Sequence, residues 1–252
     1  MVVNKRLYSL LLMSLLWSGL CLSSDCIAAT LPHLTVVTEL SPPNQTYDNG
    51  VVGGTSTELV KQIVSKASLD ADYHLYPWAR AFKVASERKN TLIYSMAKTP
   101  LREQNFHWIG PVARFELGFV TNSYRQDVKI EALEDAKKYR LAVQRGDIAA
   151  EKLEQFGFDY VLTADIERSY QLLVTNKVDL VLDDPRYIQP MTDALNLPKD
   201  HFRFVFSVPN LSVSGYLAAN IDTSDEVINK LRLAFEDVKR TELYKLVLSG
   251  YH

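Results

Sequence analysis

Short apolar runs alternate along this chain with segments of helical spacing, and this series occurs twice. In the first series the strand-like and helical segments are, in order, 34–40, 57–67, 73–76, 79–88 and 91–96. The first helical segment places Leu59, Ile63 and Ala67 on one face. Strands that alternate with helices need crossover connections, which produce a largely parallel sheet covered by helices. The pattern therefore predicts an α/β fold.

The second series begins after an extended apolar run at 114–121. Its helical and strand-like segments are, in order, 130–136, 140–144, 148–156, 160–162, 166–175, 180–182, 185–194 and 203–206. A second extended run, 214–220, leads to a final helical segment that opens with the capping-box spacing of Thr223 and Glu226. Two extended crossings predict two hinged lobes, with lobe 1 at 30–119 plus 217–252 and lobe 2 at 120–216. A single doubly wound sheet is the alternative.

The N-terminal 29 residues have the pattern of a secretory signal peptide. Lys5 and Arg6 precede an apolar run at 7–22, and small residues follow up to Ala28 and Ala29, where we expect cleavage. A membrane anchor is the alternative, but small polar residues and Asp25 interrupt the run. We expect export to the periplasm and no stable membrane insertion after cleavage.

The composition of the remaining chain excludes several classes of function. Both cysteines fall in the predicted signal peptide, so the mature chain of 223 residues (252 minus 29) has no disulfide and no cysteine metal site. Its 26 basic and 29 acidic residues form no basic stripe, which argues against a nucleic-acid partner. The five histidines lack metal-ligand spacing. We therefore expect neither a metal nor a cofactor.

Two charged residues follow strand-like runs in the two halves of the chain. Arg102 lies in Lys98-Thr-Pro-Leu-Arg102, just after the run 91–96, and Asp184 follows the run 178–182. A fixed cation and a fixed anion across a cleft would suit a zwitterion such as an amino acid, and a guanidinium matches two carboxylate oxygens. The alternatives are that Arg102 pairs with Glu103 and that Asp184 caps the helix opened by Pro185.

Several motifs occur in an order that carries a family resemblance over nearly the whole mature chain. They are Ser41-Pro-Pro43, Gly54-Thr-Ser-Thr-Glu58, Thr99-Pro-Leu-Arg102 with Phe106-His-Trp-Ile-Gly-Pro111, Gln144-Arg-Gly-Asp147, and Asn176-Lys-Val-Asp179 through Asp184. The chain resembles the polar-amino-acid family (family 3) of type II periplasmic solute-binding proteins. The resemblance implies two lobes, each a mostly parallel sheet flanked by helices, a monomer, and an ABC permease or membrane sensor as partner.

The resemblance also assigns ligand-binding residues. It places Arg102 on a ligand carboxylate, with backbone groups near Ser95 and Ala97 completing the anion site, and Asp184 on the ligand ammonium. Ala97 replaces the threonine common in the family, so one hydroxyl donor is lost.

Gly146 and Asp147 stand where lobe 2 of such proteins usually has a Gly-Thr turn. Gly146 suits a turn with positive φ. Asp147 either caps the following helix, which we favour, or repels a ligand carboxylate and reverses the expected polarity.

The segment Tyr76-Pro-Trp78-Ala-Arg80-Ala81 is the most unusual, and it resembles a less characterised branch of the family. Trp78 follows a strand, where open α/β sheets bind ligands, so it either stacks on the ligand or packs in the core. Arg80 either enters the cleft, which would favour an acidic ligand, or solvates its helix.

The sequence thus predicts a binding protein that captures a small zwitterionic or carboxylate solute by closing its lobes, and that is not an enzyme. The alternative is a periplasmic dehydratase or lyase on the same scaffold. Glu58 and Asp147 are the candidates for the general acid that such chemistry needs.

Overall fold

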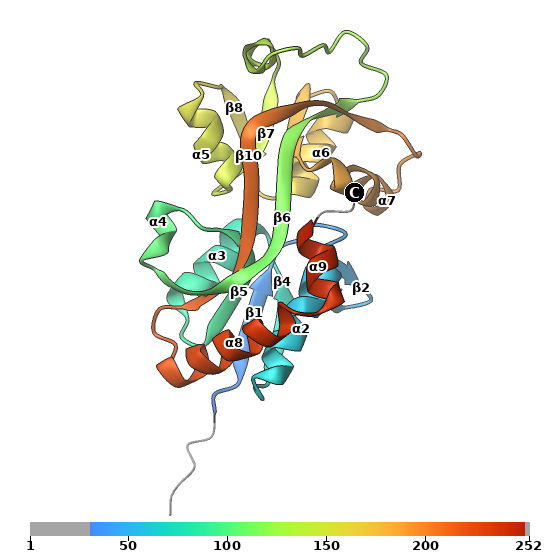
Figure 1. Cartoon of the computed structure of the whole chain (residues 1–252). Coiled ribbons are helices and arrows are strands. Elements are labelled where there is room, and N and C mark those ends of the chain that lie inside the picture. Colours follow the sequence, from blue (N-terminus) through green and yellow to red (C-terminus); the bar gives the residue numbers. More distant parts are fainter. Residues whose placement is uncertain (1–30, 250–252) are drawn as a thin grey trace, which may run out of the picture. The chain divides into compact units, whose positions relative to one another are not determined.

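A computed structural model describes residues 31–249. The predicted signal peptide, 1–29, lies outside the described residues. The described residues form a mixed α/β fold around one eight-stranded sheet, with strand order β4-β1-β5-β10-β6-β9-β7-β8 (Figure 1). A separate two-stranded hairpin pairs β2 (Thr46–Asp48) with β3 (Val51–Gly53).

Lobe 1 is built on three parallel strands. Its strands and helices are β1 (Leu34–Thr38), α2 (Thr55–Lys66), β4 (Ala71–Leu75), α3 (Trp78–Glu87), β5 (Thr91–Ala97) and the short α4 (Pro100–Glu103). β1 lies between β4 and β5 and is parallel to both. The alternation seen in the sequence therefore produces the crossover units that it predicts.

Lobe 2 repeats this arrangement. Its elements are the 3₁₀ helix η1 (Leu133–Lys138), β7 (Leu141–Gln144), α5 (Ile148–Gln155), β8 (Tyr160–Thr163), α6 (Ile166–Val174), β9 (Leu180–Asp183), the 3₁₀ helix η2 (Pro185–Tyr187) and α7 (Ile188–Ala194). β7 lies between β8 and β9 and is parallel to both. In each lobe the first strand is thus central, the second is at the sheet edge, and the third pairs with one of two long strands in the middle of the sheet.

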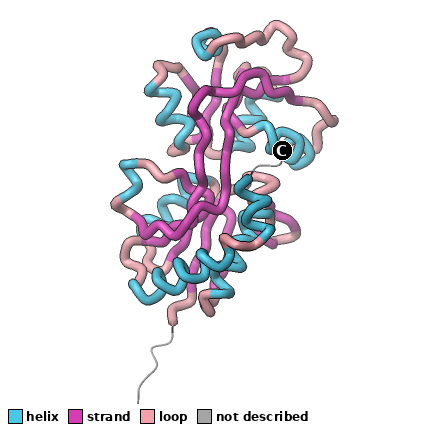
Figure 2. Tube along the Cα trace, in the orientation of Figure 1, coloured by secondary structure: helices cyan, strands magenta, loops and turns pink. Residues whose placement is uncertain are grey.

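Two long antiparallel strands connect the lobes, as the two extended runs predict. They are β6 (Phe106–Asn122) and β10 (Phe202–Asn220), which pair along most of their length and run side by side through both lobes (Figure 2). Their register shifts between Ser207 and Ser212, where β10 contains Pro209. Proline cannot donate to a strand ladder and is tolerated at such irregularities. Both crossings are longer than the sequence indicates, since β10 also includes the run expected as a separate strand at 203–206.

Helices cover both faces of the sheet, so successive residues of a strand enter different cores. Phe119 and Leu141 belong to one buried cluster of lobe 2, whereas Val120 and Ala142 belong to the cluster on the opposite face. The cluster of lobe 1 contains Trp78. Each lobe therefore has its own hydrophobic core.

The chain ends in two helices rather than one. After β10 it forms α8 (Asp225–Val238), which packs beside α2 of lobe 1, and α9 (Glu242–Ser249). The predicted capping box is wrong, because Ser224 is the N-cap of α8 and its side chain makes no capping hydrogen bond. The break between these two helices, near Thr241, was also not predicted from the sequence. There the Thr241 hydroxyl accepts from the Tyr244 backbone N–H at 3.3 Å.

The helix expected at 130–136 begins later and is a 3₁₀ helix. Asp135 explains the shift, because its carboxylate accepts from the backbone N–H groups of Glu131 and Ala132, at 3.0 and 2.9 Å, and holds that segment outside the helix. Within residues 31–249, no helix combines the length and apolar character needed to cross a membrane.

Candidate functional site

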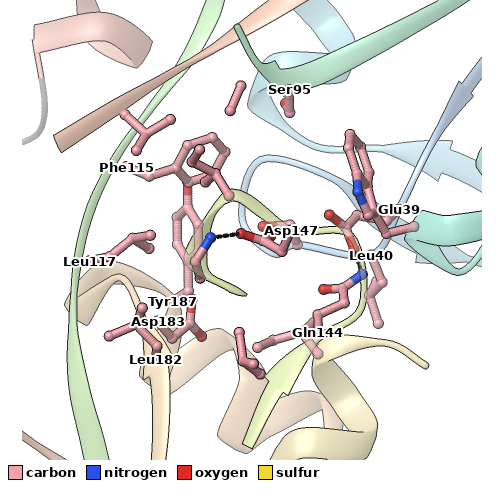
Figure 3. Close-up of a pocket in the computed structure, with 18 of the residues that line it drawn as sticks. Glu39, Leu40, Ser95, Phe115, Leu117, Gln144, Asp147, Leu182, Asp183 and Tyr187 are labelled. Carbon is pink, nitrogen blue, oxygen red and sulfur yellow. Dashed lines mark hydrogen bonds between the residues drawn. The ribbon is translucent and has the colours of Figure 1, made fainter. Parts of the chain in front are cut away.

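A cavity of about 80 Å³ lies where parallel strands of both lobes end. Its lining includes Glu39 just after β1, Ala97 at the end of β5, Gln144 at the end of β7 and Asp183 at the end of β9. Figure 3 shows Glu39 and Gln144 on one side of the cavity and Asp183 on the other. Open α/β sheets bind ligands outside the carboxyl ends of their strands, so this cavity is the candidate site.

Arg102 lines the cavity and connects the two lobes. Its side chain is buried, with Nη1 donating to the Ala97 carbonyl at 3.1 Å and Nη2 donating to the Gly146 carbonyl at 2.7 Å. Glu151 of α5 lies 3.6 Å from Nη2. The alternative pairing with Glu103 is not formed, since Glu103 pairs with Lys98 at 2.8 Å. The guanidinium is therefore positioned in the cavity and held by carbonyl groups from both lobes.

Trp78 combines the two roles that the sequence left open. It is buried in the lobe 1 core, yet it also lines the cavity. Its indole Nε1 donates to the Gly146 carbonyl at 2.9 Å, and the Arg102 guanidinium carbon lies 5.6 Å from its ring centre. Gly146 has φ +73°, as the predicted turn requires. One carbonyl of lobe 2 thus accepts two hydrogen bonds from lobe 1.

Asp183, not Asp184, faces the cavity. Asp184 is fully buried, accepts from the Glu116 backbone N–H at 2.7 Å, and pairs with Arg186 at 2.6 Å. It also caps η2, because it accepts from the Arg186 backbone N–H at 2.9 Å. Successive side chains of an extended segment point to opposite faces, so only one of these two neighbours can face the cavity. The sequence prediction placed Asp184 there, whereas the structure places Asp183 there. The structure therefore supports the capping alternative for Asp184 and brings Asp183 to the site.

Asp147 lines the cavity and also caps α5. Its Oδ1 accepts from the Ala149 backbone N–H at 2.7 Å, drawn as the dashed line in Figure 3. The favoured interpretation of this residue as a helix cap is confirmed. Burial raises the pKa of its carboxyl, and the nearby Glu151 raises it further. Asp147 therefore adds a negative group to a cavity that already holds Asp183.

Glu39 is the cavity residue that sequence reasoning missed. It accepts a hydrogen bond from Nε2 of Gln144, across from lobe 2. Burial raises its pKa to about 8, and the carboxylates of Asp147, Asp165 and Asp183 add to the effect. Burial likewise raises the pKa of Asp183 to about 7. The signal available in the sequence was position, since Glu39 lies near the end of the first strand-like run, 34–40.

The predicted anion-site residues Ser95 and Ala97 both line the cavity. Ser95 has φ +60°, and its hydroxyl accepts from the amide Nε2 of Gln45. Gln45 is fully buried and also lines the cavity. Its Oε1 has no hydrogen-bond partner among the described residues. An acceptor without a donor is costly when buried, so this oxygen indicates a missing donor.

Phe115, Leu117 and Tyr187 give the lining an apolar part, on the side of the cavity where Asp183 also lies (Figure 3). The Phe115 and Tyr187 rings meet edge to face with centres 5.8 Å apart. The Tyr187 hydroxyl accepts from the side-chain amide of Asn44, which provides a further contact between the lobes. The cavity thus combines carboxyl groups with aromatic rings.

Arg80 and Glu58 lie outside the cavity lining, as do Gly146 and Asp184. Arg80 is exposed, and its guanidinium carbon stacks 4.2 Å from the centre of the Tyr76 ring. The solvated-helix alternative for Arg80 is therefore the one observed, and the case for an acidic ligand loses its support. Glu58, a candidate general acid, pairs with Lys61 at 2.9 Å on the surface of α2. No group of three His, Cys, Asp or Glu residues among 31–249 is arranged to hold a metal ion.

Comparison with solved structures identifies the fold. A histidine kinase sensor domain with similarity to periplasmic binding proteins superposes with a TM-score of 0.76 at 16% identity, covering 87% of this chain and 95% of that one. The fold is that of the periplasmic binding proteins.

Two further structures with the same fold are those of amino-acid-binding proteins. An ancestral arginine-binding protein bound to arginine gives a TM-score of 0.72 at 20% identity, over 86% of this chain and 96% of that one. The arginine-, lysine-, histidine-binding protein ArtJ from Geobacillus stearothermophilus gives 0.73 at 18% identity, over 88% and 97%. No protein-family model and no curated protein matches the chain.

Proposed function

We propose that this protein is a periplasmic solute-binding protein that captures a small amino acid or a related carboxylate solute between its lobes. The observation that carries the proposal is the cavity at the strand ends of both lobes, with the buried Arg102 guanidinium in its lining. Arg102 has a planar set of N–H donors suited to a carboxylate. The fold shared with amino-acid-binding proteins supports the same assignment.

Closure would create the contacts that connect the lobes. Trp78 and Arg102 reach the Gly146 carbonyl, and Gln144 reaches Glu39. A ligand that lies among these groups would stabilise the closed form, because it contacts both lobes only when they are closed. We propose that the hinge lies in β6 and β10, with the lobe bounds at 119/120 and 216/217.

The closed form would then be recognised by a membrane partner, either an ABC permease or a sensor. The fold is shared with a substrate-binding protein of an amino acid ABC transporter and with a histidine kinase sensor domain. Both uses follow from the same ligand-dependent closure. We propose release to the periplasm after cleavage of the signal peptide.

A thermal-shift screen tests the function. Purified protein is melted with amino acids, dicarboxylates and short peptides, and a true ligand at a hundredfold excess over its Kd stabilises the folded state by about 2.7 kcal/mol. Mass spectrometry of the released solute should recover it unchanged. A panel without any stabilising solute, or a solute recovered as product, contradicts the proposal.

Arg102→Lys tests the assigned residue. Lysine keeps the charge but loses the planar set of donors, so we expect the affinity for the best solute of the screen to fall about 10-fold to 100-fold. The matched control is Arg88→Lys, because Arg88 is exposed at the end of α3. Equal affinity in both variants would remove Arg102 from the site.

A further inference from the structure

The cavity contains more carboxyl groups than a zwitterion needs. Among the described residues that line it, Glu39, Asp147 and Asp183 carry carboxyl groups, and Arg102 is the cation. The guanidinium is itself already bonded to the Ala97 and Gly146 carbonyls. Asp183 already accepts from the Tyr170 hydroxyl and the Asp184 backbone N–H, so Glu39 and Asp147 hold most of the free acceptor capacity.

The unpartnered Oε1 of Gln45 points to the same conclusion independently. This atom belongs to a fully buried side chain in the cavity lining, and it lacks a donor among residues 31–249. Its own amide group is already used, since Nε2 donates to Ser95. Two nitrogen donors of the lining are also engaged, because Gln144 donates to Glu39 and Trp78 to a carbonyl. A ligand with N–H groups would supply the donor that Gln45 Oε1 lacks.

We infer that the cavity selects a solute of net positive charge, and that Glu39, Asp147 and Asp183 surround its ammonium or guanidinium group. The inference rests on the proposed function and adds the substrate class. An ammonium offers three donors and a guanidinium five, so either matches the excess of acceptors. The carboxylate of such an amino acid would bind the Arg102 guanidinium.

The electrostatics of the cavity agree with this assignment. Burial raises the pKa of Glu39 to about 8 and that of Asp183 to about 7, with smaller contributions from neighbouring carboxylates. Burial and the neighbouring carboxylates both disfavour a further anion here, whereas a cation favours the ionised carboxylates. The exposed position of Arg80 removes the positive group that would have favoured an acidic ligand.

The cavity volume limits the size of the solute. A space of about 80 Å³ holds on the order of five to eight water-sized groups, since one water needs about 10–15 Å³ of this volume. A short diamino acid such as ornithine therefore suits the closed form better than a peptide.

The test compares solutes of similar size and different charge by isothermal titration calorimetry on the unmodified protein. We expect L-ornithine to bind at least tenfold more tightly than L-glutamine, and L-glutamate to bind most weakly. Tighter binding of L-glutamine or L-glutamate overturns the inference while leaving the solute-binding function intact. If the whole thermal-shift panel fails to stabilise the protein, it is the proposed function that fails.

Variants test where the positive group of the solute binds. Glu39→Gln keeps the shape of the side chain and removes its charge, and we expect it to weaken L-ornithine binding about tenfold or more. Asp147→Asn is a second variant should the first fold poorly. The matched control is Glu87→Gln, an exposed carboxylate of α3. Unchanged ornithine affinity in a folded Glu39→Gln or Asp147→Asn protein contradicts the placement.

Discussion

The two lobes share one topology but contribute differently to the site. In each, a central first strand lies between the other two parallel strands, and the cavity is formed where these strands end. Lobe 1 supplies the long donors Arg102 and Trp78 and the acceptor Glu39. Lobe 2 supplies the donor Gln144 and the acceptors, namely the Gly146 carbonyl and the carboxyl groups of Asp147 and Asp183.

This difference shows that topology places a site without determining its chemistry. Equivalent strand ends in the two lobes lead to residues of opposite hydrogen-bonding character. The division of donors and acceptors also means that neither lobe can complete the site alone. Perturbing one lobe at a time is therefore the direct way to examine it.

The largest expected effect is on pH-dependent stability. The pKa of Glu39 is 4.5 in the unfolded chain and about 8 in the folded protein, so between these pH values the folded state keeps a proton that the unfolded state has released. Asp183 behaves alike between 3.8 and about 7. Stability must then fall as pH rises, by up to about 1.4 kcal/mol per pH unit for each proton. Urea denaturation of the ligand-free protein at pH 5, 6.5 and 8 measures this.

Variants separate the contributions of the two lobes to this slope. Glu39→Gln should reduce the dependence of stability on pH up to pH 8, and Asp183→Asn should reduce it mainly below pH 7. Asp179 adds no slope in this range, because hydrogen bonds from Arg140 and Arg125 lower its pKa and it is ionised in both states. Stability that rises from pH 5 to pH 8 would contradict the raised pKa values.

The next largest effect concerns the crossing strand β6. A Cβ at Gly118 would overlap the Phe204 ring and the Phe206 carbonyl of the neighbouring strand, and one at Gly110 would overlap the Phe235 ring of α8. We expect Gly118→Ala to lower the free energy of unfolding by about 3 kcal/mol, and Gly110→Ala by about 1–2 kcal/mol, since a ring can shift more easily than backbone. Urea denaturation followed by circular dichroism compares them. A larger loss of stability for Gly110→Ala than for Gly118→Ala would show that β10 shifts more easily than the Phe235 ring of α8.

A smaller effect is expected from Trp78→Phe. The change removes one of the two donors to the Gly146 carbonyl, but Arg102 remains, so we expect a loss of about 1 kcal/mol or less. Trp108→Phe is the matched control, because its indole donates to Glu103 within lobe 1 at 3.1 Å. Small-angle scattering should show a larger radius of gyration for Trp78→Phe alone. Equal radii would mean that this bond does not hold the lobes together.

The smallest effect is expected from Arg80→Ala. The side chain is exposed and stacks on Tyr76, so its removal should change stability by about 0.5 kcal/mol or less. Solute affinity, measured by calorimetry, should stay within about twofold. A tenfold loss of affinity would return Arg80 to the site.

The sequence predicted the fold well because hydrophobic periodicity depends on local neighbours. The alternation of strands and helices, the two crossings and the turn at Gly146 all follow from residues close in the chain. The start of η1 and the break before α9 depend instead on single side-chain hydrogen bonds, from Asp135 and Thr241, that have no periodic signature.

The candidate site was predicted less completely, for two physical reasons. Asp183 and Asp184 are adjacent, and which one faces the cavity depends on strand parity, which a one-residue change of register reverses. Glu39 belongs to no motif, and its role emerges only when β1 is brought beside Gln144 from the other lobe. A search for polar residues near the end of every strand-like run would have included it.

The Gly146 carbonyl has a consequence for how this protein can be dissected. Because the acceptor belongs to the main chain, shortening a side chain does not remove it. An alanine scan of lobe 2 would pass over this contact, and a mutational map would attribute the coupling to Arg102 and Trp78 alone. Replacing the amide that follows Gly146 with an ester weakens the carbonyl as an acceptor. That change would measure the contribution of the Gly146 carbonyl to the contact between the lobes.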